Sequence, residues 1–130
     1  MENRFLFRGK RKDNAEWVIG SLIQSSIRSW ISSEQADKAR LRSVSKTQAI
    51  WRAIEVDSST ICQCTGYEGI YEKDIFQCDD ERYVIEWCDY SLCWEARAIG
   101  SSESISLGEF RPDEIVAIGN AIDNPELLEV

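Results

Sequence analysis

The chain has 130 residues, of which 43% are hydrophobic and 29% are charged, and its formal net charge is −8. This balance excludes a disordered or fibrous chain, and the length lets one domain bury a core without disulfides or metals. No apolar run approaches the roughly 20 residues that span a bilayer, and residues 1–12 lack a signal-peptide core. We therefore expect a single cytoplasmic domain over residues 1–130.

The charge is divided unevenly along the chain. Residues 1–55 hold 11 lysines and arginines against 6 aspartates and glutamates, a net charge of +5, whereas residues 56–130 hold 4 against 17, a net charge of −13. Two interpretations stay open. Either the two halves attract each other within the fold, or the basic half is an interaction surface.

Strands are predicted in the first half of the chain, because apolar side chains recur there at a spacing of two residues. The predicted strands cover residues 4–8, 17–23, 27–31 and 49–56. Residues 9–14 predict a polar turn between the first two strands. Residues 32–47 are polar and mixed in charge, which predicts a loop or a poorly anchored helix.

The strongest structural signal is strict alternation in residues 82–88, where Tyr83, Ile85 and Trp87 share one face. With the alternating residues 92–99, it predicts an antiparallel hairpin. The opposite faces carry charges that can pair across the strands and help to fix the register. These charges are Arg82 and Glu86 on one strand and Glu95 and Arg97 on the other.

Turns and strand ends are also marked in the second half. Residues 60–63 are rich in β-forming side chains, and the glycines at 66 and 69 then predict a chain reversal. Residues 114–118 predict a short strand. Asn124 is then placed to cap a short helical turn that begins with Pro125.

The sequence contains no histidine, which removes Ser-His-Asp and Cys-His catalysis and His-ligated metal sites. It also lacks a Gly-x-Gly-x-x-Gly motif and a phosphate-binding Gly-Lys-Ser/Thr loop, so nucleotide use has no sequence support. We therefore predict a protein that is not an enzyme, with no catalytic residue and no cofactor. An uncharacterised enzyme is the last-ranked alternative.

Five cysteines cannot all pair within one chain, and a reducing cytosol would keep them as thiols. They are Cys62, Cys64, Cys78, Cys88 and Cys93. A four-thiolate zinc site usually needs two Cys-x2-4-Cys knuckles, a spacing that these residues lack. We predict small core residues and no metal site.

Basic residues gather in two stretches of the first half, and two interpretations stay open for them, a basic interaction surface or solvated loops. They are Arg8, Lys10, Arg11, Lys12, Lys38, Arg40, Arg42 and Lys46. Trp17, Trp30 and Trp51 would offer stacking surfaces for nucleic acid. Against this, a pI near 4.6 opposes nucleic acid at long range, and tryptophans usually belong to the core.

Several motifs occur in the order found in the YopX-like proteins of bacteriophages and prophages, which this chain resembles. The opening Arg4-Phe5-Leu6-Phe7-Arg8 is similar to that family's first strand. The central block Thr60-Ile61-Cys62-Gln63-Cys64-Thr65-Gly66, then Ile70-Tyr71-Glu72-Lys73-Asp74-Ile75, is followed by Val84-Ile85-Glu86-Trp87. The closing Ile118-Gly119-Asn120 and Asn124-Pro125-Glu126-Leu127-Leu128 complete the resemblance. The chain departs from the usual family residues at three positions, where Cys62 replaces Gly, Cys64 replaces Tyr and Lys73 replaces Gly. The lysine at 73 puts in doubt any family role that needs a glycine conformation there.

The resemblance implies a mainly β protein with a small, partly open SH3-type barrel over residues 56–130, an N-terminal β extension over residues 1–55 and short helical turns. It implies no activity, so its motif residues are interpreted as structural. They are Gln63, Thr65, Gly66, Ile70, Tyr71, Glu72, Asp74, Trp87, Gly119, Asn120, Asn124 and Pro125.

The function predicted from these observations is that of a phage or prophage accessory protein in the bacterial cytoplasm, working as a non-enzymatic protein-interaction module. Its partner would be a phage or host protein. The alternative is a nucleic-acid-associated factor that uses the basic N-terminal half. No membrane partner is expected, and self-association stays open.

Overall fold

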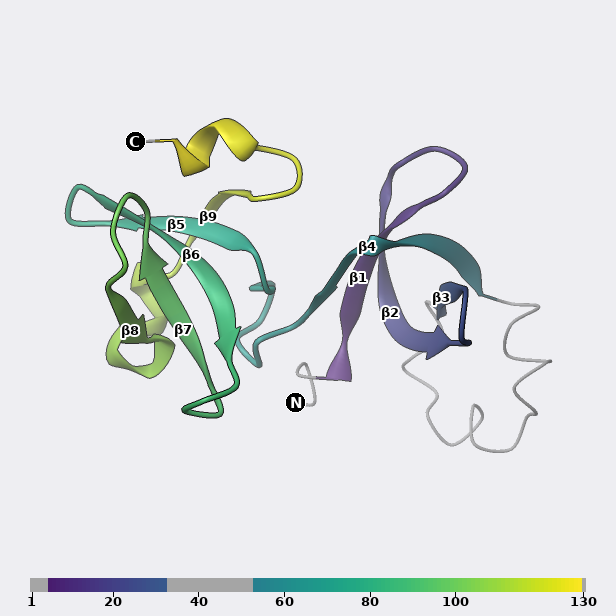
Figure 1. Cartoon of the computed structure of the whole chain (residues 1–130), viewed down its shortest axis with the longest axis horizontal. Coiled ribbons are helices and arrows are strands. Elements are labelled where there is room, and N and C mark those ends of the chain that lie inside the picture. The colour runs from purple at the N-terminus through teal and green to yellow at the C-terminus, as the bar shows by residue number, and fades with distance from the viewer. Residues whose placement is uncertain (1–4, 33–52, 130) are drawn as a thin grey trace. The chain divides into compact units, whose positions relative to one another are not determined.

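The structure is a computed structural model that describes residues 5–32 and 53–129 (Figure 1). Two compact units divide after Gly66, one over residues 1–66 and one over residues 67–130. Within the described residues, both are built from strands joined by turns, with only short 3-10 helical turns besides, which confirms the predicted mainly β class. The expected division between residues 55 and 56 falls instead inside a strand of the first unit.

The first unit, which we call the barrel unit, is a closed sheet of four antiparallel strands in the order β1-β2-β3-β4. The strands are β1 (Phe7–Arg11), β2 (Trp17–Gln24), β3 (Ser29–Ser32) and β4 (Ile54–Gln63). Pairing of β1 with β4 closes the barrel, with a register shift between Arg8 and Lys10. At this shift the Thr60 hydroxyl provides hydrogen bonds to the backbone: it accepts the Lys10 N–H at 2.8 Å and donates to the Asp57 carbonyl oxygen.

Small and branched side chains fill the inside of this barrel. Ile31 and Val56 are fully buried there, as are Cys62 on β4 and Cys64 just after it. The strands approach closely at Gly20, where a Cβ atom would overlap the Ser32 carbonyl oxygen. Glycine is therefore required at this crossing.

The second unit, which we call the sheet unit, is an open antiparallel sheet in the order β8-β7-β6-β5-β9. Its strands are β5 (Asp74–Cys78), β6 (Glu81–Cys88), β7 (Cys93–Ala98), β8 (Ser104–Ser106) and β9 (Ala117–Asn120). Three 3-10 turns accompany them, η2 (Leu107–Glu109), η3 (Pro112–Glu114) and η4 (Pro125–Leu128). Its core is an aromatic cluster, in which Phe76 stacks on Tyr83 at 5.4 Å and the Phe110 ring meets both edge-on.

The predicted hairpin of residues 82–99 is confirmed. Tyr83 pairs with Ala98, Ile85 with Ala96 and Trp87 with Trp94, so the faces predicted from alternation lie together. Of the predicted charge pairs, Arg97 bonds Glu86 at 2.9 Å. Glu86 lies directly opposite Glu95. The diagonal pair with Arg97 thus brings a cation beside two facing carboxylates.

Several sequence predictions need correction. The closed sheet lies in the barrel unit, where no barrel was predicted; the partly open barrel predicted over residues 56–130 corresponds to the five-stranded sheet, and its SH3 type stays a prediction. Strand β1 runs on to Arg11, so the turn begins only at Lys12. The strand predicted at residues 114–118 starts at Ala117, because Pro112 begins a 3-10 turn that uses Glu114. The predictions for residues 33–52 lie outside the described residues.

Candidate functional site

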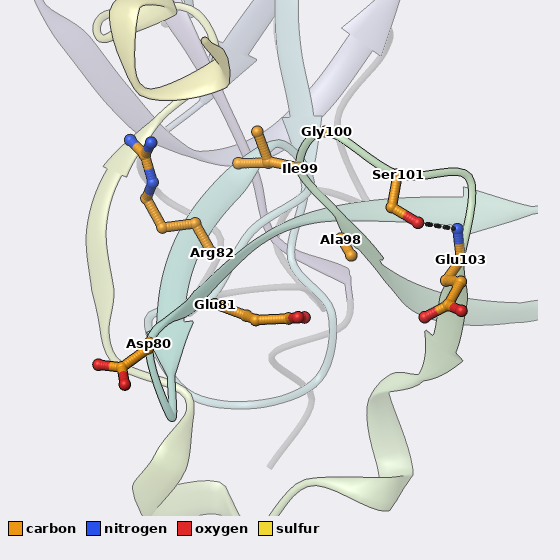
Figure 2. A pocket seen from close by; sticks show the side chains of 8 residues that line it. All are labelled: Asp80, Glu81, Arg82, Ala98, Ile99, Gly100, Ser101 and Glu103. Carbon is orange, nitrogen blue, oxygen red and sulfur yellow. Dashed lines mark hydrogen bonds between the residues drawn. The ribbon is translucent and has the colours of Figure 1, made fainter. Parts of the chain in front are cut away.

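A hollow of about 380 Å³ opens in the sheet unit between the β5–β6 turn and the end of β7 (Figure 2). It is lined by Asp80, Glu81, Arg82, Ala98, Ile99, Gly100, Ser101 and Glu103. The Ser101 hydroxyl accepts the Glu103 backbone N–H at 3.1 Å, and the Arg82 guanidinium donates to the Glu129 carbonyl oxygen at 3.0 Å. Ser101 and Arg82 thus bond backbone groups of this chain. The other charged groups that line the hollow are the carboxylates of Asp80, Glu81 and Glu103.

A second hollow, of about 510 Å³, lies beside Cys78, Tyr83 and Glu114. The Cys78 thiol donates to the Glu114 carboxylate at 3.4 Å; burial first, and then this bond, raises the pKa of Cys78. Burial and a bond to Glu81 likewise raise the pKa of Tyr83. The pKa of Glu114 is lowered, chiefly because its carboxylate accepts the Arg111 backbone N–H. Cys78 and Tyr83 therefore stay protonated at neutral pH and are poor nucleophiles.

The predicted basic surface is brought together only in part. Arg8 and Lys10 lie two residues apart on β1, and their cations lie 4.7 and 5.3 Å from the centre of the Trp17 ring on β2. Arg11 instead pairs with Asp13 at 2.7 Å, and Lys12 pairs with Glu55 at 3.3 Å. The other four, Lys38, Arg40, Arg42 and Lys46, lie outside the described residues, as does Trp51.

The end of the β6–β7 hairpin carries exposed apolar side chains. Tyr90 is 98% exposed and Leu92 72%, both in the loop that joins the strands. Trp87 is 44% exposed, and its ring meets the Trp94 ring edge-on at 5.2 Å. We call these four residues the aromatic hairpin end. The prediction that tryptophans belong to the core did not point to this surface; Tyr90, a large apolar residue between the predicted strands 82–88 and 92–99, was the signal available.

Backbone strain marks the same loop. Leu92 has a φ of 54°, in the left-handed region that costs an ordinary residue about 1–2 kcal/mol. Asn or Gly would adopt this conformation more easily. A leucine here serves the turn poorly and exposes an apolar side chain.

Motif residues around β5 build a turn. Ile70, Tyr71 and Asp74 are buried, and the Asp74 carboxylate accepts the Tyr71 backbone N–H at 2.8 Å. Lys73 between them has a φ of 71°. Although a lysine stands where the family usually has glycine, the backbone thus keeps the left-handed conformation that glycine favours.

The closing motif forms a second turn. The Asn120 side-chain oxygen accepts the backbone N–H groups of Ile122 and Asp123, at 3.0 and 2.8 Å. Pro125 begins η4 as predicted, but Asn124 does not cap it. Its side-chain oxygen instead accepts the Asn120 N–H at 3.2 Å. A Cβ at Gly119 would lie 2.6 Å from this same oxygen.

The remaining motif residues lie around the junction of the two units. Gln63 ends β4, Thr65 is half-buried, and Gly66 has a φ of 104°. Glu72 is half-buried before β5. Most motif residues thus lie in these turns or near the division after Gly66, and their structural role stays a prediction.

All five cysteines are free thiols. Cys62 and Cys64 are buried, as predicted for small core residues, whereas Cys78, Cys88 and Cys93 are half-buried. Within residues 5–32 and 53–129, no three His, Cys, Asp or Glu side chains are grouped so that they could hold a metal ion.

The comparisons with known proteins identify the family. The chain matches the family described as YopX protein over residues 6–129. No curated protein matches the chain. In the part of the chain that the structure describes, no helix is long and apolar enough to span a membrane. Because the match extends over nearly the whole chain and agrees with the motifs quoted above, this protein belongs to the YopX family.

Proposed function

We propose that this protein is a non-enzymatic protein-interaction module, an accessory protein of a phage or prophage acting in the bacterial cytoplasm, and that it binds its partner through the aromatic hairpin end. The observation that carries the proposal is the exposure of Tyr90 and Leu92 beside the Trp87–Trp94 pair. Tyrosine and tryptophan supply most of the binding free energy in many protein interfaces.

Charge indicates the chemistry of the partner. Residues 67–130 hold 4 lysines and arginines against 16 aspartates and glutamates, a net charge of −12. Asp89 and Glu95 lie within and beside the hairpin loop. A partner that fits this surface has an apolar recess surrounded by lysine or arginine, because complementary charge speeds association and selects the partner.

The strain at Leu92 supports the same surface. Its left-handed backbone costs stability, and its side chain is 72% exposed, so burial within this chain does not offset that cost. Strained residues often mark functional positions. Burial of Leu92 against a partner would supply the missing compensation.

The test compares two double variants of the tagged full-length protein in extracts of its host cells. Tyr90→Ser with Leu92→Gly removes the hairpin contact and keeps the loop backbone. Ile27→Ser with Val116→Ser removes two apolar side chains that are 81% and 64% exposed elsewhere. We expect basic proteins enriched by the wild type to fall at least about tenfold with the hairpin variant, the loss of a typical hot spot, and to persist with the control. Equal retention by both variants, or no enriched protein, contradicts the proposal.

A second candidate function is nucleic-acid binding by the barrel unit, which the position of Arg8 and Lys10 over Trp17 favours. Two cations and an aromatic ring on one strand face resemble the elements that bind single strands. Residues 1–66 hold 11 lysines and arginines against 7 acids, so this unit has a net charge of +4.

Oligonucleotide binding across a salt series separates this candidate from the first. Lys10→Gln should weaken binding and reduce its salt dependence, because fewer counterions are released. Lys12→Gln makes the same charge change two residues along the chain, at a lysine that pairs with Glu55, whereas Lys10 lies over the Trp17 ring, and is the matched control. Absence of salt-dependent binding at micromolar protein excludes the nucleic-acid function and leaves the protein-binding proposal untouched.

A further inference from the structure

We propose that Cys88 and Cys93 form a dithiol site that low-molecular-weight disulfides oxidise reversibly to a cross-strand disulfide. The proposal concerns the sheet unit alone and does not depend on the proposed function. It rests on strand register, on the contacts of Ser91 and on accessibility.

Strand register brings the two cysteines together. Cys88, the last residue of β6, lies directly opposite Cys93, the first residue of β7. Residues directly opposite in an antiparallel pair project to the same face. Their Cα atoms are then about 4.5–5.5 Å apart, within the range of about 4.4–6.8 Å that disulfides span.

Ser91 lies against both sulfurs. Its backbone N–H donates to the Cys88 sulfur at 3.5 Å, and its hydroxyl lies 3.3 Å from the Cys93 sulfur. The same hydroxyl donates to the Glu95 carboxylate at 3.3 Å. Because the Ser91 hydroxyl uses its hydrogen for the bond to Glu95, its oxygen accepts a hydrogen bond from the Cys93 thiol. One loop residue therefore joins the two sulfurs.

Accessibility distinguishes this pair from the other cysteines. Cys62 at the end of β4 and Cys64 just after it are 0% and 1% exposed, so a reagent does not reach them in the folded barrel unit. Cys78 is half-buried on β5, where its register partner is Glu81. Cys88 and Cys93 are half-buried at the loop end of a hairpin and face each other.

The chemistry is thiol–disulfide exchange. The thiolate of one cysteine attacks a small disulfide, forming a mixed disulfide and releasing one small thiol. The second cysteine thiolate then attacks the protein sulfur of that mixed disulfide, which forms the Cys88–Cys93 bond and releases the second small thiol. Two electrons and two thiol protons pass to the small disulfide, which is reduced to two thiols.

The position in the ladder makes the bond easy to reduce. Ile99 donates to the Arg82 carbonyl, so 82 and 99 are a hydrogen-bonded pair, and the alternation along the ladder makes 88 and 93 one too. Cβ atoms in such pairs lie near the wide end of about 4.5–5.5 Å, whereas a disulfide has them about 3.8 Å apart. The strands must draw together, and strained disulfides have more oxidising potentials. The site is thus suited to reversible oxidation.

The experiment incubates the reduced full-length protein with glutathione disulfide and maps its peptides by mass spectrometry. We expect the folded protein to lose the mass of two hydrogen atoms, all in one Cys88–Cys93 linkage, and dithiothreitol to reverse it. Cys88→Ser and Cys93→Ser should each abolish the internal bond and give a glutathione adduct on the remaining cysteine. Cys78→Ser, the control, should leave the bond unchanged.

Stable glutathione adducts on both Cys88 and Cys93 of the wild type, no reaction at either residue, or an internal bond that uses Cys78 would each overturn the proposal. The wild-type peptide map gives this answer even if a serine variant fails to fold. Circular dichroism of the Trp87–Trp94 pair is a second measurement, since the bond would close the strand pair next to it and change the coupling of the two rings.

Discussion

The two units of this chain obtain their stability in different ways. The barrel unit closes its sheet on itself, so each of its four strands pairs on both sides, and its strands approach so closely that Gly20 leaves no room for a Cβ atom. The sheet unit leaves β8 and β9 as edges and depends on three packed aromatic rings. The barrel should therefore suffer most from added atoms and the sheet from removed ones.

The charges of the units differ as much as their cores. The barrel unit is positive and presents cations beside an aromatic ring, whereas the sheet unit is strongly negative and presents aromatic and aliphatic side chains. One chain thus carries two surfaces of different chemistry. The cationic surface lies on a face of the closed sheet in the barrel unit. The apolar surface lies on the loop at the hairpin end of the sheet unit.

The largest expected effect is the loss of an aromatic ring from the sheet unit. Phe76→Ala should lower the free energy of unfolding by about 3–5 kcal/mol, because the ring is fully buried and its removal leaves a cavity beside Tyr83 and Phe110. Amide hydrogen exchange in β5–β7 measures it. Phe76→Leu, which keeps most of the volume, should cost about 1.5 kcal/mol or less. A loss below about 1 kcal/mol for Phe76→Ala would show that the ring packing does not stabilise this core, and an equally large loss for Phe76→Leu would contradict the cavity explanation.

The next effect tests the barrel by adding one methyl group. Gly20→Ala should cost about 3 kcal/mol, because the new Cβ overlaps the Ser32 carbonyl oxygen and a backbone atom cannot turn away as a side chain does. Hydrogen exchange in β1–β4 measures it. Gly108→Ala is the control, since its Cβ would have only the Ser106 hydroxyl at 3.8 Å. If Gly20→Ala left the free energy of unfolding unchanged, close approach of the strands could not be what distinguishes the barrel unit from the sheet unit.

Local patterns predicted the hairpin well, because its alternation and its turn lie within 18 consecutive residues, 82–99. They did not place the closed barrel, since closure depends on pairing Phe7 with Gln63, far along the chain, and alternation says which residues share a face but not which strands meet. The alternation also placed Trp87 on the same face as Tyr83 and Ile85. That face continues past the aromatic core, so the side chain emerges at the hairpin end.

The family motif shows the same limit. Gly66 predicted a chain reversal at the correct place and Pro125 a helical turn, since these residues favour turns wherever they occur, whereas the cap predicted at Asn124 was wrong. The pattern did not reveal that Lys73 and Leu92 adopt positive φ, because their own preference opposes it and the surrounding hydrogen bonds decide. Lys73, for example, is held by its N–H bond to the Ile85 carbonyl and by its carbonyl bond to the Ala121 N–H.

A smaller effect, of opposite sign, is expected at that residue. Lys73→Gly should raise the free energy of unfolding by about 1 kcal/mol, because glycine adopts a φ of 71° without the steric cost that a Cβ brings. Lys73→Ala keeps the cost and removes the charge, so it should change stability little. Urea unfolding of the wild type and the two variants shows whether the backbone conformation or the lysine side chain determines the change in stability. An equal gain in both variants would assign the effect to the lysine side chain.

The smallest expected effect concerns the ion pair of Arg97 with Glu86, a surface bond in a unit that depends on its buried rings. The Arg97 side chain is 38% exposed and that of Glu86 47%, so water screens their attraction. A double-mutant cycle with Glu86→Gln and Arg97→Gln should give a coupling of about 0.5 kcal/mol or less, decreasing with added salt. Glu86 also faces Glu95 across the strands, and Glu86→Gln relieves that repulsion. Glu86→Gln alone should therefore be nearly neutral, while Arg97→Gln destabilises slightly because it leaves the two carboxylates facing each other. A coupling above 1.5 kcal/mol would mean that surface charge, and not the aromatic core alone, holds the sheet unit together.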